Sequence, residues 1–162
     1  MRVGFITDKN GFRAPLHPDS LQKYDKTQLF VDKDVFRNLE LNAKDYKKLK
    51  VLNKTTLKQM DVICFVDTVE ISVIKTLKAG AAVVGLFNTK TKKEIKKIRP
   101  DISLYDFFQL PRISRAQNLD ALSSQANLLG YSSVLRASLE TSNVIPMMTT
   151  AAGNISPAKV LI

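Results

Sequence analysis

The sequence predicts an α/β fold in which a parallel sheet is covered by helices on both faces. Short runs of β-branched and aromatic residues alternate with stretches of helical character, which is the pattern of parallel sheets. The 162 residues, 44% of them hydrophobic and 25% charged, are enough to bury the core of one domain. Beyond residue 111, apolar residues recur at helical spacing, which predicts one long helix near the carboxyl end.

Five apolar runs predict the strands of the sheet. They lie at residues 2–7, 27–31, 61–66, 81–87 and 101–107. A short helix over 19–24 is expected after the first strand. Two further helices are expected between the later strands, one over 68–80 with Gly80 as its C-cap and one over 91–98 that ends before Arg99 and Pro100.

The predicted long helix has two different faces. Its apolar side carries Leu119, Leu122, Ala126 and Leu129, and its other side carries Gln117, Asp120, Ser124, Asn127 and Tyr131. No residue from 121 to 135 is charged, although a face in contact with water normally carries Lys and Glu. We therefore expect a neighbouring domain or subunit to cover this polar face. A central helix of the domain's own core is an equally good interpretation.

The carboxyl-terminal segment is expected to be irregular from residue 140 until its last residues. The final "KVLI" predicts the opening of a buried strand, so a second domain is expected to begin there. Cys64 is expected to be a small buried hydrophobe, which favours a reducing, cytoplasmic setting. The amino-terminal residues do not resemble a signal peptide, and no window reaches the roughly 18 apolar residues of a membrane span.

The net charge of +10 comes mainly from lysine-rich stretches at 43–50 and 89–99. Few aromatic residues lie among these lysines and no nucleic-acid signature accompanies them, so we expect a solvated surface and no nucleic-acid partner. A functional anionic partner is the alternative. A nucleic-acid binder would show strongly salt-dependent binding.

The best candidate site precedes and opens the long helix. Arg112 and Arg115 supply guanidinium donors, Gln117 an amide, and Asp120 with Ser123 an acceptor and a hydroxyl, a set that can hold a carboxamide group. The competing interpretation is that Asp120 pairs with an arginine to satisfy the helix start. The single histidine, His17, is expected in a loop, and no metal site is predicted.

Two segments carry a family resemblance. The segment "LPRISRAQNLDALSSQANLLGY" at 110–131, together with "PMMTTAAGNISPAKVLI" at 146–162, resembles the NAD(H)-binding alpha subunit of proton-translocating NAD(P) transhydrogenases, relatives of the alanine dehydrogenases. The resemblance implies a Rossmann-like domain over 1–112, an interdomain helix over 113–141, and a linker with the first strand of an NAD-binding domain over 142–162.

The same resemblance implies roles for the candidate residues. Arg112, Gln117 and Asp120 would be catalytic through orientation of the nicotinamide, and with Arg115 and Ser123 they would bind NAD(H). Hydride would then pass to NADP(H) on a partner subunit, with no protein acid or base at the transferred carbon. The implied partners are a second copy in a homodimer, the NAD-binding domain, and the membrane and NADP-binding subunits. They would hold the chain on the cytoplasmic side of the inner membrane.

Two departures from the family pattern limit these expectations. The glycine turn that cradles the pyrophosphate is absent from the 162 residues, so we expect the isolated chain to be inactive alone. The positions that match the pyruvate-binding basic residue and histidine of alanine dehydrogenases hold Phe65 and Leu86, and Arg13 is followed by Ala14 and Pro15. The alternative hypothesis is a truncated, non-enzymatic remnant or assembly module of the same family.

Overall fold

The computed structural model describes residues 1–8, 13–24, 26–39, 41–67 and 69–161. The chain divides into two compact units, Met1–Pro111 and Arg112–Ile162. The first unit contains a large sheet and its helices, and the second contains a long helix and a hairpin.

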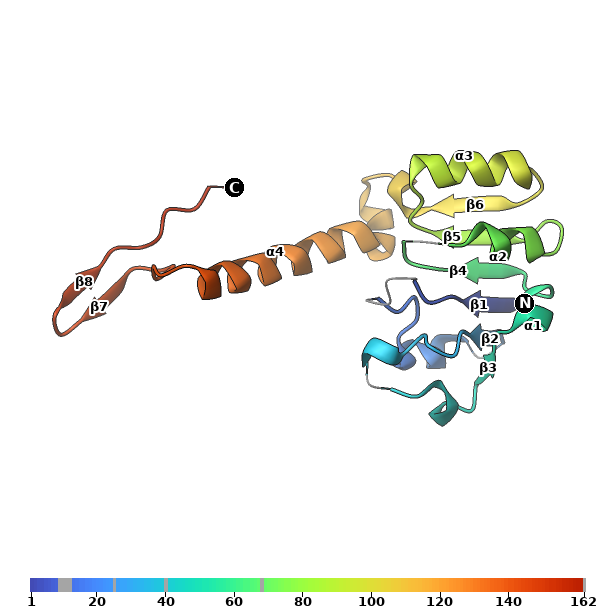
Figure 1. Cartoon of the computed structure of the whole chain (residues 1–162), viewed down its shortest axis with the longest axis horizontal. Coiled ribbons are helices and arrows are strands. Elements are labelled where there is room, and N and C mark those ends of the chain that lie inside the picture. Colours follow the sequence, from blue (N-terminus) through green and yellow to red (C-terminus); the bar gives the residue numbers. More distant parts are fainter. Residues whose placement is uncertain (9–12, 25, 40, 68, 162) are drawn as a thin grey trace. The chain divides into compact units, whose positions relative to one another are not determined.

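The first unit is built on a six-stranded, wholly parallel sheet with the order β3-β2-β1-β4-β5-β6 (Figure 1). Its strands are β1 (Arg2–Phe5), β2 (Gln28–Val31), β3 (Leu49–Val51), β4 (Val62–Cys64), β5 (Ala82–Gly85) and β6 (Ser103–Asp106). The chain winds outward from β1 to β3 and then from β4 to β6 in the opposite direction. This is the doubly wound order of Rossmann folds. The predicted α/β class with a Rossmann-like parallel sheet is confirmed.

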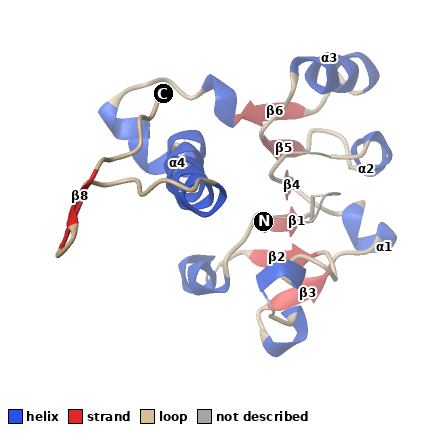
Figure 2. Cartoon of the chain, turned by 60° about the vertical axis from the view of Figure 1, so that its left-hand side comes forward, coloured by secondary structure: helices blue, strands red, loops and turns tan. Residues whose placement is uncertain are grey.

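Helices cover both faces of this sheet. The helices α1 (Lys54–Leu57), α2 (Ile71–Thr76) and α3 (Thr89–Ile98) lie on one face (Figure 2). The 3₁₀ helix η1 (Pro18–Tyr24) packs through Leu21 on the other face. The shorter 3₁₀ helices of the unit are η2 (Arg37–Leu39), η3 (Ala43–Asp45) and η4 (Phe107–Gln109). Two of the α-helices begin at an asparagine cap, because Asn53 accepts from the backbone of α1 and Asn88 from that of α3.

The sheet separates two hydrophobic cores, and single strands contribute to both. On β2, Leu29 and Val31 are buried in the core beneath η1, whereas Phe30 between them belongs to the core beneath α1 to α3. This alternation follows from the two-residue repeat of a strand. On β1, a Cβ atom at Gly4 would lie 2.7 Å from Cδ1 of Ile63, so this position has room only for glycine while Ile63 keeps its place.

The second unit contains the 3₁₀ helix η5 (Ser114–Leu119), the long helix α4 (Ala121–Glu140) and an antiparallel hairpin. The hairpin strands are β7 (Met148–Thr150) and β8 (Gly153–Ile155). Gly153 has a φ of 124°, a backbone conformation that favours glycine. No residue of α4 is buried. Its expected cover by a neighbouring domain or subunit stays a prediction.

Several expected element boundaries are wrong. The long helix expected over 113–141 begins only at Ala121, because η5 occupies the preceding turn. The helix expected to end at Gly80 ends at Thr76, and Gly80 instead lies, with a φ of 71°, in the turn before β5. Residues 159–161 are not in a strand, and Ile162, the last residue of the strand expected at 159–162, lies outside the described residues. Two features were not predicted, the β7–β8 hairpin and the edge strand β3.

Among the described residues, no helix is both long and apolar enough to cross a membrane.

Candidate functional site

The turn that leads into α4 brings two of the predicted site residues together. Asp120 is the N-cap of α4, where its Oδ1 accepts a hydrogen bond from the backbone N–H of Ser123 at 2.9 Å. The hydroxyl of Ser123 donates to Oδ2 of the same carboxylate at 2.6 Å. These two hydrogen bonds fix the orientation of the Asp120 carboxylate. Capping of the helix is enough to explain this orientation.

These contacts determine the charge of Asp120. The hydrogen bond from the Ser123 hydroxyl lowers the pKa of Asp120 the most, the Ser123 backbone N–H lowers it further, and the positive charge of Arg112 adds a smaller effect. The carboxylate is therefore ionised at neutral pH and acts only as an acceptor. Each carboxylate oxygen has two lone pairs, so both oxygens can accept a further hydrogen bond while Ser123 holds them.

The remaining predicted residues, Arg112, Arg115 and Gln117, precede α4. Their side chains are exposed and make no hydrogen bond or ion pair with the described part of the chain. The backbone beneath them is held by η5, in which the N–H of Asp120 donates to the carbonyl of Gln117 at 3.1 Å. The donors of these three side chains are available for a ligand. The predicted ion pair between Asp120 and an arginine is not formed within 4.0 Å; Asp120 caps the helix through Ser123 instead.

A second place of interest is the crevice at the carboxyl ends of β1, β4 and β5, beside the point where the strand order reverses. Ligands of doubly wound sheets bind in such crevices. The cavity here has a volume of about 260 Å³. It is lined by Phe5, Pro15, Tyr24, Cys64, Phe65, Val66, Val84, Leu86 and Phe107.

None of these lining residues carries a positive charge that could hold the carboxylate of a 2-oxo acid. Phe65 and Leu86 occupy the positions that the resemblance assigns to a basic residue and a histidine in alanine dehydrogenases, and both are buried. Phe65 packs edge-to-face against Phe87 with ring centroids 5.0 Å apart. Arg13 forms an ion pair with Asp67. The described crevice does not fit the chemistry of an alanine dehydrogenase.

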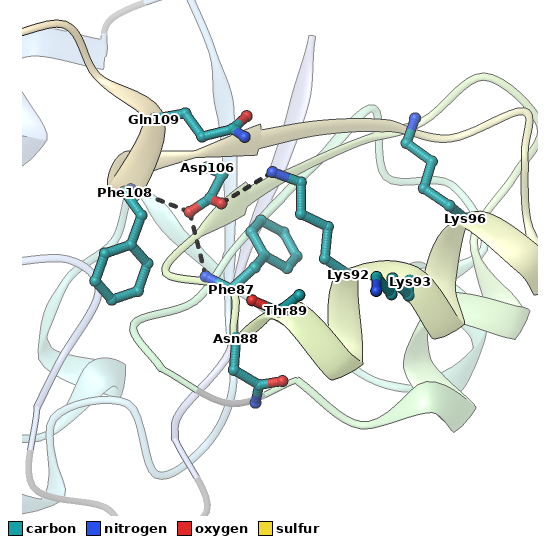
Figure 3. Close-up of a pocket in the computed structure, with 9 residues that line it drawn as sticks. All are labelled: Phe87, Asn88, Thr89, Lys92, Lys93, Lys96, Asp106, Phe108 and Gln109. Atoms are coloured by element: carbon teal, nitrogen blue, oxygen red, sulfur yellow. Dashed lines mark hydrogen bonds and ion pairs between the residues drawn. The ribbon is translucent and has the colours of Figure 1, made fainter.

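A third place, which the sequence did not predict, lies between α3 and the end of β6 (Figure 3). Asp106 has a side chain only 4% exposed, and its Oδ2 accepts from Nζ of Lys92 at 3.1 Å. Its Oδ1 accepts from the backbone N–H groups of Phe108 at 3.0 Å and Phe87 at 3.4 Å. The only sequence signal was an aspartate within the last run predicted as a strand, which is too common to mark a site.

This cavity, which we call the α3 pocket, has a volume of about 730 Å³. It is lined by Phe87, Asn88, Thr89, Lys92, Lys93, Lys96, Asp106, Phe108 and Gln109. Three lysines and one aspartate give its walls an excess of positive charge.

The described residues contain no cluster of three or more His, Cys, Asp or Glu side chains that could hold a metal ion. His17 lies in the loop before η1, where its Nδ1 accepts the backbone N–H of Asp19 at 3.3 Å.

Comparison with known proteins places the chain beside one group of enzymes. It is similar to an NAD(P) transhydrogenase alpha subunit of Rickettsia prowazekii, with 45% identity over 93 residues, which cover 56% of this chain and 24% of the relative. The corresponding subunit of Rhodospirillum rubrum is 38% identical over 91 residues, covering 55% and 24%. The NAD(P) transhydrogenase subunit alpha of Haemophilus influenzae is 37% identical over 115 residues, covering 70% and 22%. No family model matches the chain.

The fold agrees with this likeness. The crystal structure of transhydrogenase from Sinorhizobium meliloti matches with a TM-score of 0.84 and 28% identity, over 98% of this chain and 50% of that chain. The chain thus spans about a quarter of the length of these curated relatives and half of the solved chain. The expected resemblance is confirmed by sequence and by fold.

Proposed function

We propose that this chain orients the nicotinamide of NAD(H) for hydride transfer to NADP+ on a partner subunit. The proposal starts from its homology to the amino-terminal region of NAD(P) transhydrogenase alpha subunits. The observation that supports this most is the turn before α4. It combines one fixed, ionised carboxylate with three exposed side chains whose donors are not engaged by any residue that the structure describes.

The side chains of this turn fit the carboxamide of nicotinamide. A carboxamide offers an NH₂ donor and a carbonyl acceptor. Asp120 would accept from the NH₂ group, and Arg112 and Gln117 would donate to the carbonyl oxygen. Ser123 would keep the carboxylate of Asp120 in place, and Arg115 would add a second guanidinium beside the bound cofactor.

The role of these residues in the reaction would be positional. NAD(H) supplies the hydride when bound, so no side chain needs to move a proton at the transferred carbon. Holding the ring in one orientation is worth several kcal/mol in a transfer between two bound partners, and misplacement by about 1 Å costs about a hundredfold in rate. Arg112, Gln117 and Asp120 would therefore act on the rate through orientation.

The proposal also includes a second domain and the partner subunits with which this chain would work. The 162 residues contain no glycine-rich turn for a pyrophosphate, so a second, NAD-binding domain would complete the site. NADP(H) would bind on a partner subunit, and membrane subunits would couple the transfer to proton translocation and hold the chain at the inner membrane. We also propose a homodimer. The alternative of a non-enzymatic remnant is not favoured, because the similar proteins are transhydrogenase subunits.

Substitutions in the complete, assembled transhydrogenase test the orienting role. Asp120→Asn and Gln117→Ala should each lower the rate of hydride transfer from NADH to NADP+ by about tenfold to a hundredfold, because each removes one contact that orients the ring. Asn127→Ala is the matched control, since Asn127 is an exposed amide further along α4. Unchanged turnover in both variants would remove these residues from the mechanism.

Titration of the chain of 162 residues with NADH tests the need for a second domain. Binding should be weak, because only the nicotinamide end would be contacted. A dissociation constant below about 1 μM, which corresponds to about 8 kcal/mol of binding free energy, would contradict this element of the proposal.

A further inference from the structure

The α3 pocket lies at the carboxyl edge of the sheet, two strands away from the point where the strand order reverses, and the proposed function leaves it unused. It opens at the carboxyl ends of β5 and β6, beside the short connection from β5 to α3. Its volume of about 730 Å³ falls within the range of small-molecule sites, roughly 300 to 1,000 Å³. A bare inorganic ion would fill little of this space, so its size suits an organic ligand.

The charge of the pocket favours an anionic ligand. Lys92 is neutralised by the buried carboxylate of Asp106, and this pair holds α3 against the end of β6 (Figure 3). Lys93 and Lys96 also line the pocket, and neither has a carboxylate partner among the described residues. Within the described part of the chain, the ammonium of Lys96 donates only to the carbonyl of Ile102, at 3.4 Å. Two uncompensated positive charges therefore remain in one concave site.

The lysines of α3 also repel one another. Lys93 and Lys97 are four residues apart and Lys93 and Lys96 three, and like charges at these spacings destabilise a helix. A bound anion would relieve some of this repulsion. The helix end is a smaller contribution, because Asn88 already accepts the N–H of Thr91 at 2.8 Å.

The rest of the pocket wall suits a planar ring. Phe108 lines the pocket and is 60% exposed as a residue, which is unusual for a phenylalanine. Exposed aromatic faces stack on nucleobases, and the amide of Gln109 beside it can both donate and accept.

We propose that the α3 pocket binds a nucleoside phosphate, with its phosphates at Lys93 and Lys96 and its base on Phe108. This binding site consists only of residues of the first unit, and it goes beyond the proposed orientation of nicotinamide by the turn before α4.

Calorimetric titration of the chain with ADP, and separately with pyrophosphate, tests the site. The double variant Lys93→Gln/Lys96→Gln should weaken the binding of both probes by about tenfold or more, because charge-assisted contacts to phosphate are lost. The matched control is Lys90→Gln/Lys97→Gln, which removes the same charge from residues of α3 that do not line the pocket. It should change either affinity by less than about threefold, an effect of diffuse charge alone.

Two further variants identify the contacts. Phe108→Ala should weaken ADP binding about tenfold and leave pyrophosphate binding unchanged, because only ADP carries a base. Asp120→Asn should leave both affinities unchanged, so that a failure of the proposed NAD(H) site and a failure of this site give different results. Lys93, Lys96 and Phe108 are exposed, and circular dichroism of each variant confirms the fold.

Three results would overturn the proposal. The first is no measurable binding of ADP to the wild-type chain at low ionic strength. The second is an equal loss of affinity in the two lysine double variants, which would indicate diffuse attraction of anions to a basic surface. The third is loss of ADP binding in Asp120→Asn but not in Lys93→Gln/Lys96→Gln, which would place ADP at the turn before α4.

Discussion

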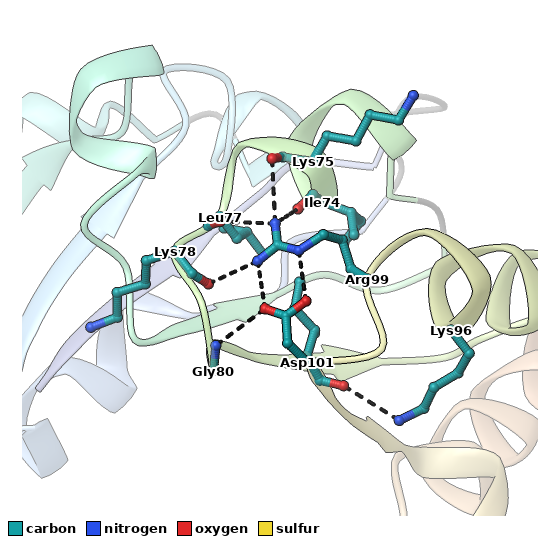
Figure 4. Close-up of polar contacts among 9 residues, drawn as sticks. Ile74, Lys75, Leu77, Lys78, Gly80, Lys96, Arg99 and Asp101 are labelled. Carbon is teal, nitrogen blue, oxygen red and sulfur yellow. Dashed lines mark hydrogen bonds and ion pairs between the residues drawn. The ribbon is translucent and has the colours of Figure 1, made fainter.

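Arg99 connects the end of α2 to the turn before β6 (Figure 4). Its Nη1 donates to the carbonyls of Ile74 at 3.1 Å and Leu77 at 2.9 Å, at the carboxyl end of α2 where carbonyls lack intrahelical i+4 partners. The same guanidinium donates through Nε and Nη2 to both carboxylate oxygens of Asp101, each at 2.8 Å. A planar fork of donors is needed for this arrangement, which a lysine could not reproduce.

The Arg99 contact predicts a pH dependence of stability. The hydrogen bonds from Arg99 lower the pKa of Asp101 from 3.8 to about 2. Because the folded-state pKa lies below that of the unfolded chain, the stabilisation is complete above about pH 4 and is lost as the pH falls through about 2. As the pH is lowered between these two values, the urea concentration at the midpoint of unfolding should fall less for Asp101→Asn than for the wild type. Parallel curves for the two proteins would contradict the prediction.

Cys64 provides a second prediction at the residue scale. Burial raises the pKa of its thiol from 9.0 to about 11, which lowers the thiolate fraction at neutral pH by about a hundredfold. Its alkylation by iodoacetamide at pH 7 should therefore be slower than that of free cysteine by at least this factor, and should become rapid in urea. Equal rates for the folded chain and for free cysteine would show that the thiol is not protected.

At the scale of elements, regular patterns could be predicted and short or irregular ones could not. The runs that form β1, β2, β4, β5 and β6 are apolar, and α3 and α4 have helical periodicity. The strand β3 has only three residues at the sheet edge, with Lys50 and Val51 exposed, so its sequence carries no burial pattern. The segment before α4 continues the helical spacing, which predicts helix there, yet the cap at Asp120 starts α4 only at the next residue.

The charge crowding on α3 also gives a prediction. Lys93→Glu replaces repulsion with attraction toward Lys96 and Lys97, so it should raise the free energy of unfolding by about 0.5 kcal/mol. The same change should abolish the binding of ADP, because a carboxylate would face the phosphates. Urea unfolding and calorimetric titration measure the two effects. A variant that is both more stable and still binds ADP would show that the repulsion serves no ligand.

At the scale of the whole molecule, the candidate sites differ in how far sequence could find them. The residues from Arg112 to Ser123 are close in sequence, so a local motif could mark them. The α3 pocket depends on Lys92 and Asp106 meeting across 14 residues, which requires the order of β5 and β6 in the sheet. The strand order depends on which strands pair with each other, and the apolar runs in the sequence do not specify these pairs.

The placement of the two cores gives a prediction about the chain as a whole. Every residue of both hydrophobic clusters belongs to Met1–Pro111. A chain of residues 1–111 should therefore fold alone and melt cooperatively within about 5 °C of the full chain, since it keeps the buried apolar area that drives folding. Calorimetry compares the two transitions. A fragment without a cooperative transition would show that residues 112–162 are needed for folding.

The alternation along β2 determines which changes in chain length the protein tolerates. Leu29 and Val31 are packed on one side of the sheet and Phe30 on the other. One residue inserted ahead of them would put the phenylalanine in the place of Val31 and the leucine in the place of Phe30, so that one core would be overpacked and the other underpacked. Two inserted residues would restore the alternation. In this strand, an insertion of an even number of residues should therefore be tolerated better than one of an odd number. In a surface turn, the tolerance should depend only on the length of the insertion.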